Sequence, residues 1–403
     1  MTALPWLTVV GIGEDGLDGL SEAALRAITA AEVLVGGARH LAMVPDAGCE
    51  RLVWPSPFDS MVDELRKRKR LRVVVLASGD PMLFGVVPVL LRHFDLSEMT
   101  VLPGLSAFTL ACARLGWARA WVEGLTLHGR PVDLLHPAVQ PGARILALSS
   151  DGTTPAKAAA LLRARGYGPS RMVVLEHMGG PRERRVEATA DTLPDGPFAD
   201  LNTIAIECVA APGAPLLARV PGLPDDAFRH DGQITKREVR AVTLAALAPV
   251  PGQTLWDVGA GCGSVAIEWL RTHPKCNAVA VEHRADRLAL IADNAAALGV
   301  PNLRVVEGRA PDALADLAPP DAVFVGGGLT APGVAEACWN ALPTGGRFVA
   351  NAVTLEGEAV LIALHRRLGG SLTQVAVSRA AAVGGFTGWQ PMRPVVQFAA
   401  IKP

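Results

Sequence analysis

The chain has 403 residues and a formal net charge of −1, and half of its residues are hydrophobic. This length and composition predict two domains with large apolar cores, with three domains as the alternative, and exclude a mostly disordered chain. The balanced charge gives no general reason to bind nucleic acid or acidic membranes, so we expect neither partner. The basic run at residues 66–70 is interpreted as the solvated end of a helix, with a patch that binds an anion or nucleic acid as the alternative.

Six cysteines are scattered along the chain without a C-x-x-C pair. This spacing predicts a reduced, cytoplasmic protein without a cysteine metal site, and we expect no bound metal. No apolar run approaches the ~20 residues that cross a bilayer. The first residues also lack the charged region that begins a signal peptide.

The first half alternates short apolar strands with helical stretches, which predicts an α/β domain with mostly parallel strands. A first strand at residues 7–10 runs into the glycine turn 11–16, and Ser21 is expected to cap the helix 22–31. Further strands are expected at 33–35, 72–77, 99–102, 144–148, 172–175 and 203–208, and helices at 58–68, 106–115 and 155–165.

Four prolines fall within residues 211–224. Prolines at this density prevent regular elements and favour an extended connector. We therefore place a linker there, between a domain of residues 1–210 and a domain of residues 225–403. A buried loop within one domain is the alternative.

The second half continues the α/β alternation as a more regular series. The helix expected at 285–298 carries an apolar stripe, which predicts that it covers a sheet. The last two strands, joined by a Gly-rich loop, are expected to form an antiparallel hairpin that completes a sheet of about seven strands. Strands are expected at 254–258, 278–282, 303–307, 322–325, 347–350, 372–377 and 395–401, and the other helices at 235–248, 265–271, 311–317, 332–341 and 356–368.

One turn in this series has the features of a nucleoside-cofactor loop. Gly259, Gly261 and Gly263 follow an apolar strand and lead directly into a helix. Glycines allow a tight turn and close approach of a ligand, and the start of a helix presents free N–H groups. The run can be read as the dinucleotide pattern G-x-G-x-x-A, ending at Ala266, or as the G-x-G-x-G loop of class I methyltransferases.

Two neighbouring acids bear on the choice between these cofactors. Glu282 ends the next strand, where either fold places an acid on ribose hydroxyls, so it does not decide. Asp257 precedes the glycines, where its charge would repel a pyrophosphate and attract the ammonium and sulfonium of S-adenosylmethionine. With the expected hairpin, this favours S-adenosylmethionine. An NAD-dependent oxidoreductase that uses residues 259–266 is the alternative, and a tight turn without a binding function is a further one.

Several segments of the second half resemble the C-terminal methyltransferase of cobalamin-pathway enzymes, at residues 225–240, 257–263, 281–283, 307–314 and 321–328. Arg309 departs from the family pattern, which usually has Asp there. Asn351 and Arg379, with Trp389, match segments that line the tetrapyrrole side, so both are candidate catalytic residues, with loop packing as the alternative. The resemblance implies methyl-donor contacts from Thr235, Gly259, Ala260, Gly261, Cys262, Gly263, Glu282 and Ala310.

The first half resembles the tetrapyrrole (class III) methyltransferases. Residues 77–85 are similar to their G-D-P loop and residues 102–108 to their P-G-x-S segment, and 127–130 and 174–183 also recur in that family. The resemblance implies a donor held between two α/β subdomains, 1–103 and 104–210, by Asp80, Leu83, Gly85 and Ser106.

Structural alternatives are open for some residues of the first half, and the resemblance implies further candidates there. A turn-capping aspartate is the alternative for Asp80. His128 and Arg130 are candidate catalytic residues that would face the carboxylates of the substrate, since a guanidinium suits bidentate carboxylate contact. For His128, a satisfied polar residue at a strand end is the alternative.

In this order, the two halves resemble the decarboxylating precorrin methyltransferases that act on carbons 5 and 15. The resemblance implies a tetrapyrrole methyltransferase fold followed by a Rossmann-like class I sheet, in a homo-oligomer. It also implies S-adenosylmethionine at one site per domain, with residues 1–210 methylating C5 of precorrin-6B and residues 225–403 methylating C15. Loss of carbon dioxide from the C12 acetate would then give precorrin-8. A non-catalytic tetrapyrrole carrier is a further alternative.

Overall fold

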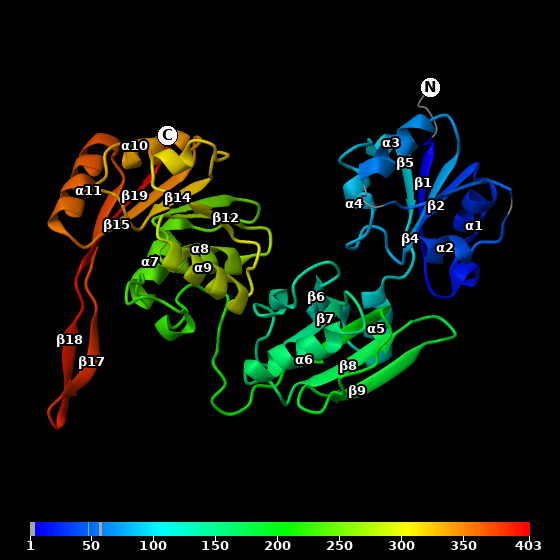
Figure 1. Ribbon diagram of the computed structural model, residues 1–403, viewed down its shortest axis with the longest axis horizontal. Helices are drawn as coiled ribbons and strands as arrows, with labels where there is room; N and C mark the ends of the chain where they lie inside the picture. Colours follow the sequence, from blue (N-terminus) through cyan, green and yellow to red (C-terminus); the bar gives the residue numbers. More distant parts are fainter. Residues whose placement is uncertain (1–4, 47, 56–58) are drawn as a thin grey trace. The chain divides into compact units, whose positions relative to one another are not determined.

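The computed structural model describes residues 5–46, 48–55 and 59–403 (Figure 1). The chain divides into two compact units, one made of residues 1–132 and 141–214 and the other of residues 133–140 and 215–403. The division falls inside the proline-rich segment 211–224. The later part of that segment packs on the second unit, because Leu217 and Leu223 are buried in its core.

The first unit begins with a five-stranded sheet in the order β3-β2-β4-β1-β5, and all neighbouring strands are parallel. Helices cover both faces, with α1 and α2 on one and α3 and α4 on the other. Because both faces are covered, the strands read as short apolar runs. The elements are β1 (Leu7–Ile12), α1 (Glu22–Thr29), β2 (Val33–Gly36), α2 (Ala38–Ala42), β3 (Glu50–Val53), α3 (Asp59–Lys67), β4 (Val73–Ser78), α4 (Val87–Leu90) and β5 (Met99–Leu102).

Two helices that cover this sheet begin or end with the residues predicted for them. Ser21 caps α1, since its side chain accepts a hydrogen bond from the backbone N–H of Ala24 (3.3 Å). Arg66 and Lys67 occupy the last turn of α3, where cations interact favourably with the helix dipole. The predicted start of that helix at residue 58 lies outside the described residues.

The second sheet of this unit is mixed, in the order β6-β7-β10-β8-β9. Only β6 and β7 are parallel, so the expectation of mostly parallel strands is wrong for this sheet. The chain returns from β8 to β9 through a short loop, a connection that is open only to antiparallel strands. The elements are α5 (Ala107–Leu115), β6 (Glu123–Thr126), β7 (Arg144–Leu148), α6 (Thr154–Ala164), β8 (Arg171–Glu176), β9 (Arg184–Thr189) and β10 (Asn202–Glu207).

The second unit contains a seven-stranded sheet in the order β13-β12-β11-β14-β15-β19-β16. Its last strand β19 runs antiparallel to both β15 and β16, which confirms the predicted antiparallel end of the sheet. Helices α7, α8 and α9 pack on one face, and α10 and α11 on the other. The strands are β11 (Thr254–Val258), β12 (Asn277–Glu282), β13 (Arg304–Glu307), β14 (Ala322–Val325), β15 (Arg347–Ala352), β16 (Ser371–Val375) and β19 (Val395–Ile401).

The helices of this unit are close to those predicted, except near residues 311–317, where the structure has only a short 3-10 turn. The α-helices are α7 (Arg237–Leu247), α8 (Ser264–Thr272), α9 (Ala285–Ala297), α10 (Val334–Ala341) and α11 (Leu355–Leu368). Short 3-10 helices of the chain are η1 (Gly16–Gly19), η2 (Leu96–Glu98), η3 (Arg119–Trp121), η4 (Val132–Leu135), η5 (Asp225–Ala227) and η6 (Asp312–Leu314).

The segment between β16 and β19 is not the simple Gly-rich loop that was predicted. It forms a two-stranded arm, β17 (Ser378–Val383) and β18 (Phe386–Pro391), which projects from the sheet (Figure 1). The glycines at its tip make the turn between the two strands. Phe386 is 83% exposed and Trp389 is 78% exposed on this arm.

Across residues 5–46, 48–55 and 59–403, none of the helices combines the length and the apolarity needed to cross a membrane.

Candidate functional sites

Both units place a glycine-rich turn at the point where the order of the strands reverses. In the first sheet the chain leaves β1 toward β2 on one side and leaves β4 toward β5 on the other. In the second unit β11 and β14 have the same relationship. Open α/β sheets bind ligands outside the carboxyl ends of strands at such switch points. The glycine-rich turn predicted in each half therefore follows a strand at such a switch point.

In the first unit, the turns after β1, β4 and β5 interlock. The backbone N–H of Gly79 donates to the carbonyl of Ile12 (3.0 Å), and the N–H of Gly104 donates to the carbonyl of Gly79 (3.0 Å). A Cβ at Gly11 would lie 1.8 Å from the carbonyl oxygen of Gly79, so only glycine allows this approach. The interlock brings together the loops that carry the predicted donor contacts.

The four residues predicted to contact the donor lie in these loops. Each of them also has a structural role within the protein. Asp80 Oδ1 accepts a hydrogen bond from the N–H of Met82 (2.9 Å), which is the turn-capping role considered as the alternative. Ser106 is buried and caps α5 by accepting from the N–H three residues on (3.0 Å). Leu83 packs against the core of the second sheet. A Cβ at Gly85 would lie 2.4 Å from the carbonyl four residues earlier.

His128 and Arg130 are exposed on the turn that follows β6. The N–H of His128 donates to Thr126 Oγ1 (3.2 Å), and the N–H of Gly129 donates to Ser150 Oγ (3.4 Å). These bonds place the turn beside the loop after β7, at an edge of the mixed sheet. Contact of either side chain with a substrate stays a prediction.

A charged cluster that the sequence analysis missed lies at the carboxyl edge of the first sheet. The carboxylate of Glu14, just after β1, accepts from Arg39 on α2 and forms a hydrogen bond with His177 Nδ1 (2.9 Å). Arg39 also donates to Ser78 Oγ at the end of β4 (3.0 Å). Burial raises the pKa of Glu14, but the hydrogen bond with His177 and the charge of Arg39 outweigh it, so the pKa lies below its usual value. Glu14 and His177 each lie in a glycine-containing segment that the sequence analysis singled out, residues 11–16 and 174–183, and this could have drawn attention to them.

In the second unit, the strand, tight turn and helix around the glycines are as predicted. Gly259, Gly261 and Gly263 have φ values of 71°, 61° and 79°, which favour glycine. A Cβ at Gly259 would lie 2.7 Å from the backbone of Gly327, in the loop after β14. At Gly261, no atom of the described residues other than its two chain neighbours lies within 4 Å of that position. The turn thus borders open space beside the start of α8.

Glu282 is brought to this turn, and both of its carboxylate oxygens are engaged. Oε2 accepts from the N–H of Gly261 (3.0 Å), and Oε1 accepts from the N–H groups of His283 (2.8 Å) and Arg284 (3.0 Å). The side chain is 2% exposed. A carboxylate has about four acceptor sites, so ribose hydroxyls could share these oxygens with the backbone. The ribose contact stays a prediction.

Asp257 lies beneath the turn and not at its surface. Oδ2 accepts from the N–H of Ala266 (3.0 Å), and Oδ1 has no hydrogen-bond partner among the described residues. Burial, together with the charge of Glu282 and against the hydrogen bond from Ala266, raises the pKa of Asp257 to about 7. A carboxyl that is partly protonated near neutral pH weakens the charge argument that favoured S-adenosylmethionine over a pyrophosphate.

The remaining predicted donor contacts flank the turn. Thr235 precedes α7, and its carbonyl accepts from Arg240 Nη1 (2.5 Å). The N–H of Gly308 donates to the carbonyl of Glu282 (3.0 Å), which brings the loop that carries Ala310 to the end of β12. Within the turn, Ala260 is partly buried and Cys262 is buried.

Asn294 on α9 connects the turn to the segment before α7, and the sequence analysis missed it. Its Nδ2 donates to the carbonyls of Cys262 (3.0 Å) and Arg229 (2.9 Å), and its Oδ1 accepts from the N–H of Arg229 (2.8 Å). The side chain is 1% exposed. A signal was present, because Asn294 is a polar residue between Ile291 and Leu298 on the apolar stripe of this helix.

A buried ion pair holds the chain that leads into α7. Arg240 is 0% exposed, Glu268 is 2% exposed, and Arg240 Nε donates to Glu268 Oε1 (2.6 Å). Glu268 also accepts from the N–H groups of Gly222 (2.6 Å) and Leu223 (2.9 Å). The pair therefore joins α7, α8 and the end of the proline-rich segment.

Asn351 and Arg379 are engaged within the protein. Asn351, at the end of β15, donates to Thr243 Oγ1 (2.9 Å) and accepts from Gln397 Nε2 (3.0 Å), which matches the packing alternative. Arg379 on β17 donates to Glu238 Oε2 (2.6 Å) and to Asp225 Oδ2 (3.1 Å). A substrate role for either stays a prediction.

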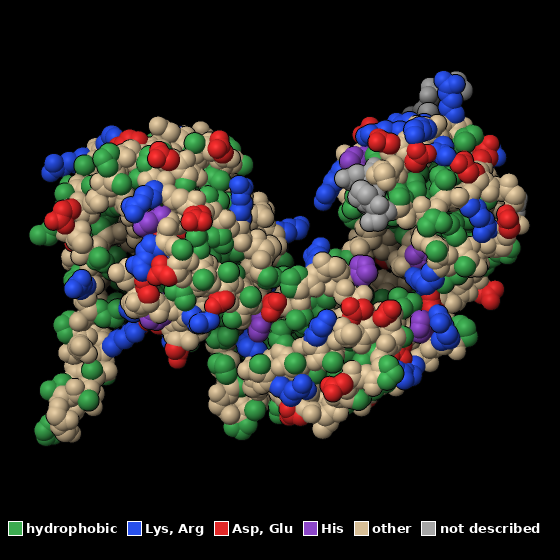
Figure 2. Space-filling model, viewed as in Figure 1, with side chains coloured by type: hydrophobic (Ala, Val, Ile, Leu, Met, Phe, Trp, Pro, Cys, Tyr) green, Lys and Arg blue, Asp and Glu red, His purple; other side chains and the backbone are tan. Residues whose placement is uncertain are grey.

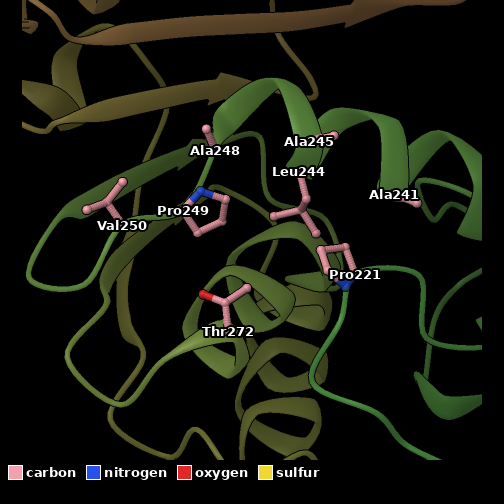
Figure 3. Close-up of a pocket in the computed structure, with 8 residues that line it drawn as sticks. All are labelled: Pro221, Ala241, Leu244, Ala245, Ala248, Pro249, Val250 and Thr272. Atoms are coloured by element: carbon pink, nitrogen blue, oxygen red, sulfur yellow. The ribbon is translucent and has the colours of Figure 1, made fainter.

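A shallow apolar hollow of 480 Å³ lies at the opposite end of α8 from the glycine turn (Figure 3). It is lined by Pro221, Ala241, Leu244, Ala245, Ala248, Pro249, Val250 and Thr272. Thr272 ends α8, whereas the turn leads into the beginning of that helix. The hollow is therefore separate from the candidate donor site.

The two halves of the chain match two families of methyltransferase. Residues 7–194 match the family of Tetrapyrrole (Corrin/Porphyrin) Methylases, and residues 226–402 match the Precorrin methyltransferase domain. The open backbone at Gly261 and the start of α8 fit a nucleoside-containing donor. Fold and matches together define a two-domain methyltransferase whose methyl donor is S-adenosylmethionine.

Several relatives cover nearly the whole chain. The protein from Sinorhizobium sp named "Precorrin-6Y C(5,15)-methyltransferase [decarboxylating]" is 49% identical over 399 residues, which is 99% of this chain and 97% of that protein. The chain therefore belongs to the family of decarboxylating precorrin-6Y C(5,15)-methyltransferases.

Two shorter relatives each match less than half of the chain. The "Cobalt-precorrin-7 C(5)-methyltransferase" of Salmonella typhimurium is 36% identical over 179 residues, 44% of this chain and 88% of that protein. The "Probable cobalt-precorrin-6B C(15)-methyltransferase (decarboxylating)" of Pyrobaculum calidifontis is 37% identical over 182 residues, 43% of this chain and 93% of that protein.

Proposed function

We propose that this chain methylates carbons 5 and 15 of precorrin-6B, also called precorrin-6Y, and decarboxylates the C12 acetate to give precorrin-8. The observation that carries this proposal is the 49% identity, over nearly the full length of both chains, to a protein named for that reaction. The order of the two methyltransferase domains is a second support.

Each unit is proposed to hold one donor. A glycine turn at a switch point in each unit supports two sites. Residues 1–210 would serve C5, and residues 225–403 would serve C15 and the decarboxylation. The existence of two shorter relatives, each named for one of these methylations, supports this division.

S-adenosylmethionine supplies an electrophilic methyl group on a sulfonium. The reduced macrocycle is enamine-like at its meso carbons, so the protein need not provide a strong nucleophile. Its residues instead hold the carbon and the methyl group in line, which can contribute at best ~7–11 kcal/mol. In the second unit the donor would be held by Glu282 and by the glycine turn, whose carbonyl at Cys262 accepts a hydrogen bond from Asn294.

For the decarboxylation, the C–COO⁻ bond of the acetate breaks, carbon dioxide leaves, and the electron pair passes into the protonated, conjugated ring. A proton then adds to the former acetate CH2, which becomes a methyl group on C12. The substrate itself therefore provides the electron sink. The chain contributes a fixed orientation of the acetate relative to the plane of the ring.

The chain is further proposed to act in the cytoplasm as a homo-oligomer, without nucleic acid or membrane partners. Val383, Phe386 and Trp389 on the β17–β18 arm support association, because exposed apolar groups of this size favour burial against a partner. On the face seen in Figure 2, the tip of the arm shows no charged side chain, and elsewhere charges of both signs are interspersed.

Equilibrium binding of S-adenosylhomocysteine tests the two-site proposal. The full chain should bind two equivalents and no NAD, and Glu282→Ala should leave one equivalent. Retention of NAD without binding of S-adenosylhomocysteine would instead support the oxidoreductase alternative.

A further inference from the structure

We infer that Arg39, His177 and Arg182, grouped around Glu14, form a subsite for a carboxylate of the tetrapyrrole. The inference rests on the proposed methylation in the first unit and names residues for its substrate.

The cluster is assembled from both sheets of that unit. Glu14 and Arg39 follow strands of the parallel sheet, whereas His177 and Arg182 come from the loop between β8 and β9. Arg182 Nη2 lies 3.7 Å from Glu14 Oε2 and 3.5 Å from His177 Nδ1. A Cβ at Gly180 would lie 2.7 Å from the Cβ of Glu14, so this loop rests directly on the turn after β1. The four side chains therefore meet at one place.

That place is the switch point of the parallel sheet. Glu14 follows β1, and Arg39 and His40 both reach Ser78 at the end of β4, at 3.0 Å and 2.9 Å. The strand order reverses between β1 and β4, and ligands bind outside the carboxyl ends of strands at such points. The cluster thus borders the space in which a substrate of this unit is expected.

The cluster carries an excess of positive charge. Glu14 supplies one negative charge against the two guanidinium groups of Arg39 and Arg182. Neighbouring carboxylates of the β8–β9 region are engaged elsewhere, Glu183 with Arg114 and Glu176 with Arg184. Burial, and then the charge of Arg39, lowers the pKa of His40 to about 4, so His40 adds no charge at neutral pH.

Arg182 has donors to spare for a ligand. Its side chain is 70% exposed, whereas that of Arg39 is 36% exposed and that of Glu14 is 10% exposed. Arg39 spends Nη1 on Glu14 and Nη2 on Ser78. A guanidinium with free N–H groups suits bidentate contact with a carboxylate, and the inner members of the cluster hold it in place.

Backbone strain and apolar surface occur at the same edge. His177 has a φ of 46° and Phe84 a φ of 54°, a region that costs energy for residues other than glycine. Phe84, Met82 and Leu105 are exposed on the interlocked loops after β4 and β5. A macrocycle with an apolar ring and carboxylate arms is complementary to apolar loops beside a cationic cluster.

The test compares Arg182→Gln with Arg185→Gln in the full chain. Arg185 is a matched control, because it lies on the neighbouring strand β9 and donates to Glu187 (2.6 Å). Precorrin-6B binding is followed by absorbance titration, and methylation at C5 by NMR with ¹³C-methyl-labelled S-adenosylmethionine.

For R182Q, we expect about a tenfold rise in the dissociation constant and in the KM of the tetrapyrrole at C5, with kcat and the affinity for S-adenosylhomocysteine unchanged. R185Q should behave as wild type. Wild-type tetrapyrrole affinity for R182Q, or an equal loss of affinity for S-adenosylhomocysteine, would overturn the subsite. If R182Q weakens tetrapyrrole binding but the wild-type chain adds no methyl at C5, the subsite stands and the proposed function fails.

Discussion

The side chain of Asn294 donates a hydrogen bond to the carbonyl oxygen of Cys262, so one buried residue on α9 fixes the shape of the glycine turn in the second unit. The same side chain makes two hydrogen bonds with the backbone of Arg229. Two segments that would flank a bound donor are therefore held by one amide.

Asn294→Ala should weaken donor binding in the second unit. Loss of these three hydrogen bonds leaves backbone groups of both segments unsatisfied, so neither segment is held in the shape that binds the donor. We expect about a tenfold loss of S-adenosylhomocysteine affinity at one of two sites by calorimetry. Asp293→Asn is the control, since it removes only an exposed ion pair with Arg229 and should change little. Equal effects of the two variants would contradict this role for Asn294.

Asp257 should make stability depend on pH. Its pKa is about 7 in the folded chain against an ordinary 3.8, so between these values the folded state keeps a proton that the unfolded chain loses. The stabilising contribution of the protonated carboxyl is complete below pH 3.8 and is lost as the pH rises through 7.

Asp257→Asn tests this dependence because the amide stays neutral at every pH. The melting temperature of the variant, minus that of the wild type, should increase from pH 5 to pH 8 in a calorimetric series. Parallel curves for the two proteins would show that Asp257 does not titrate in this range.

Glu282→Ala should abolish methylation at C15 and leave methylation at C5. The substitution removes the acceptor that holds the N–H of Gly261 as well as the expected ribose contact. Positions of ¹³C-labelled methyl groups in the product distinguish the two steps. Glu336→Ala is a control, because Glu336 lies on α10 in an exposed pair with Arg367. Loss of both methylations would show that the two units do not work independently.

Substitutions on the arm should reduce association. Phe386→Ser with Trp389→Ser removes the largest apolar side chains of β17 and β18. The mass measured by light scattering should fall toward that of one chain. Trp121→Ser is the control, because Trp121 is 82% exposed but lies in the first unit. An unchanged mass for the arm variant would locate the interface elsewhere.

Local pattern predicted most of the elements, and contacts between distant residues account for what it missed. Apolar runs marked β1, β4 and β11, whose side chains are buried on both faces of a parallel sheet. Half of the residues of β3 and most of those of β9 are polar, and none of their side chains is fully buried, so these strands gave no comparable signal. Strand direction in the mixed sheet depends on pairing, which composition does not encode.

In the candidate sites too, sequence spacing predicted some contacts and missed those between distant residues. Spacing alone predicted that Glu282 lies close to the glycine turn, because Glu282 and the turn lie at the carboxyl ends of adjacent parallel strands. The contact between Glu14 and His177 joins residues that are 163 positions apart, so no local pattern predicts it. Asp257 was found, but its burial beneath the turn depends on the packing of α8 and could not be read from its position alone.

The central claim is tested most directly by incubating the purified chain with precorrin-6B and isotopically labelled S-adenosylmethionine, followed by mass spectrometry of the tetrapyrrole. The account predicts a product that has gained two labelled methyl groups and lost one carbon dioxide. A tetrapyrrole that binds but returns unchanged in mass would contradict it, as would a single methyl gain without decarboxylation.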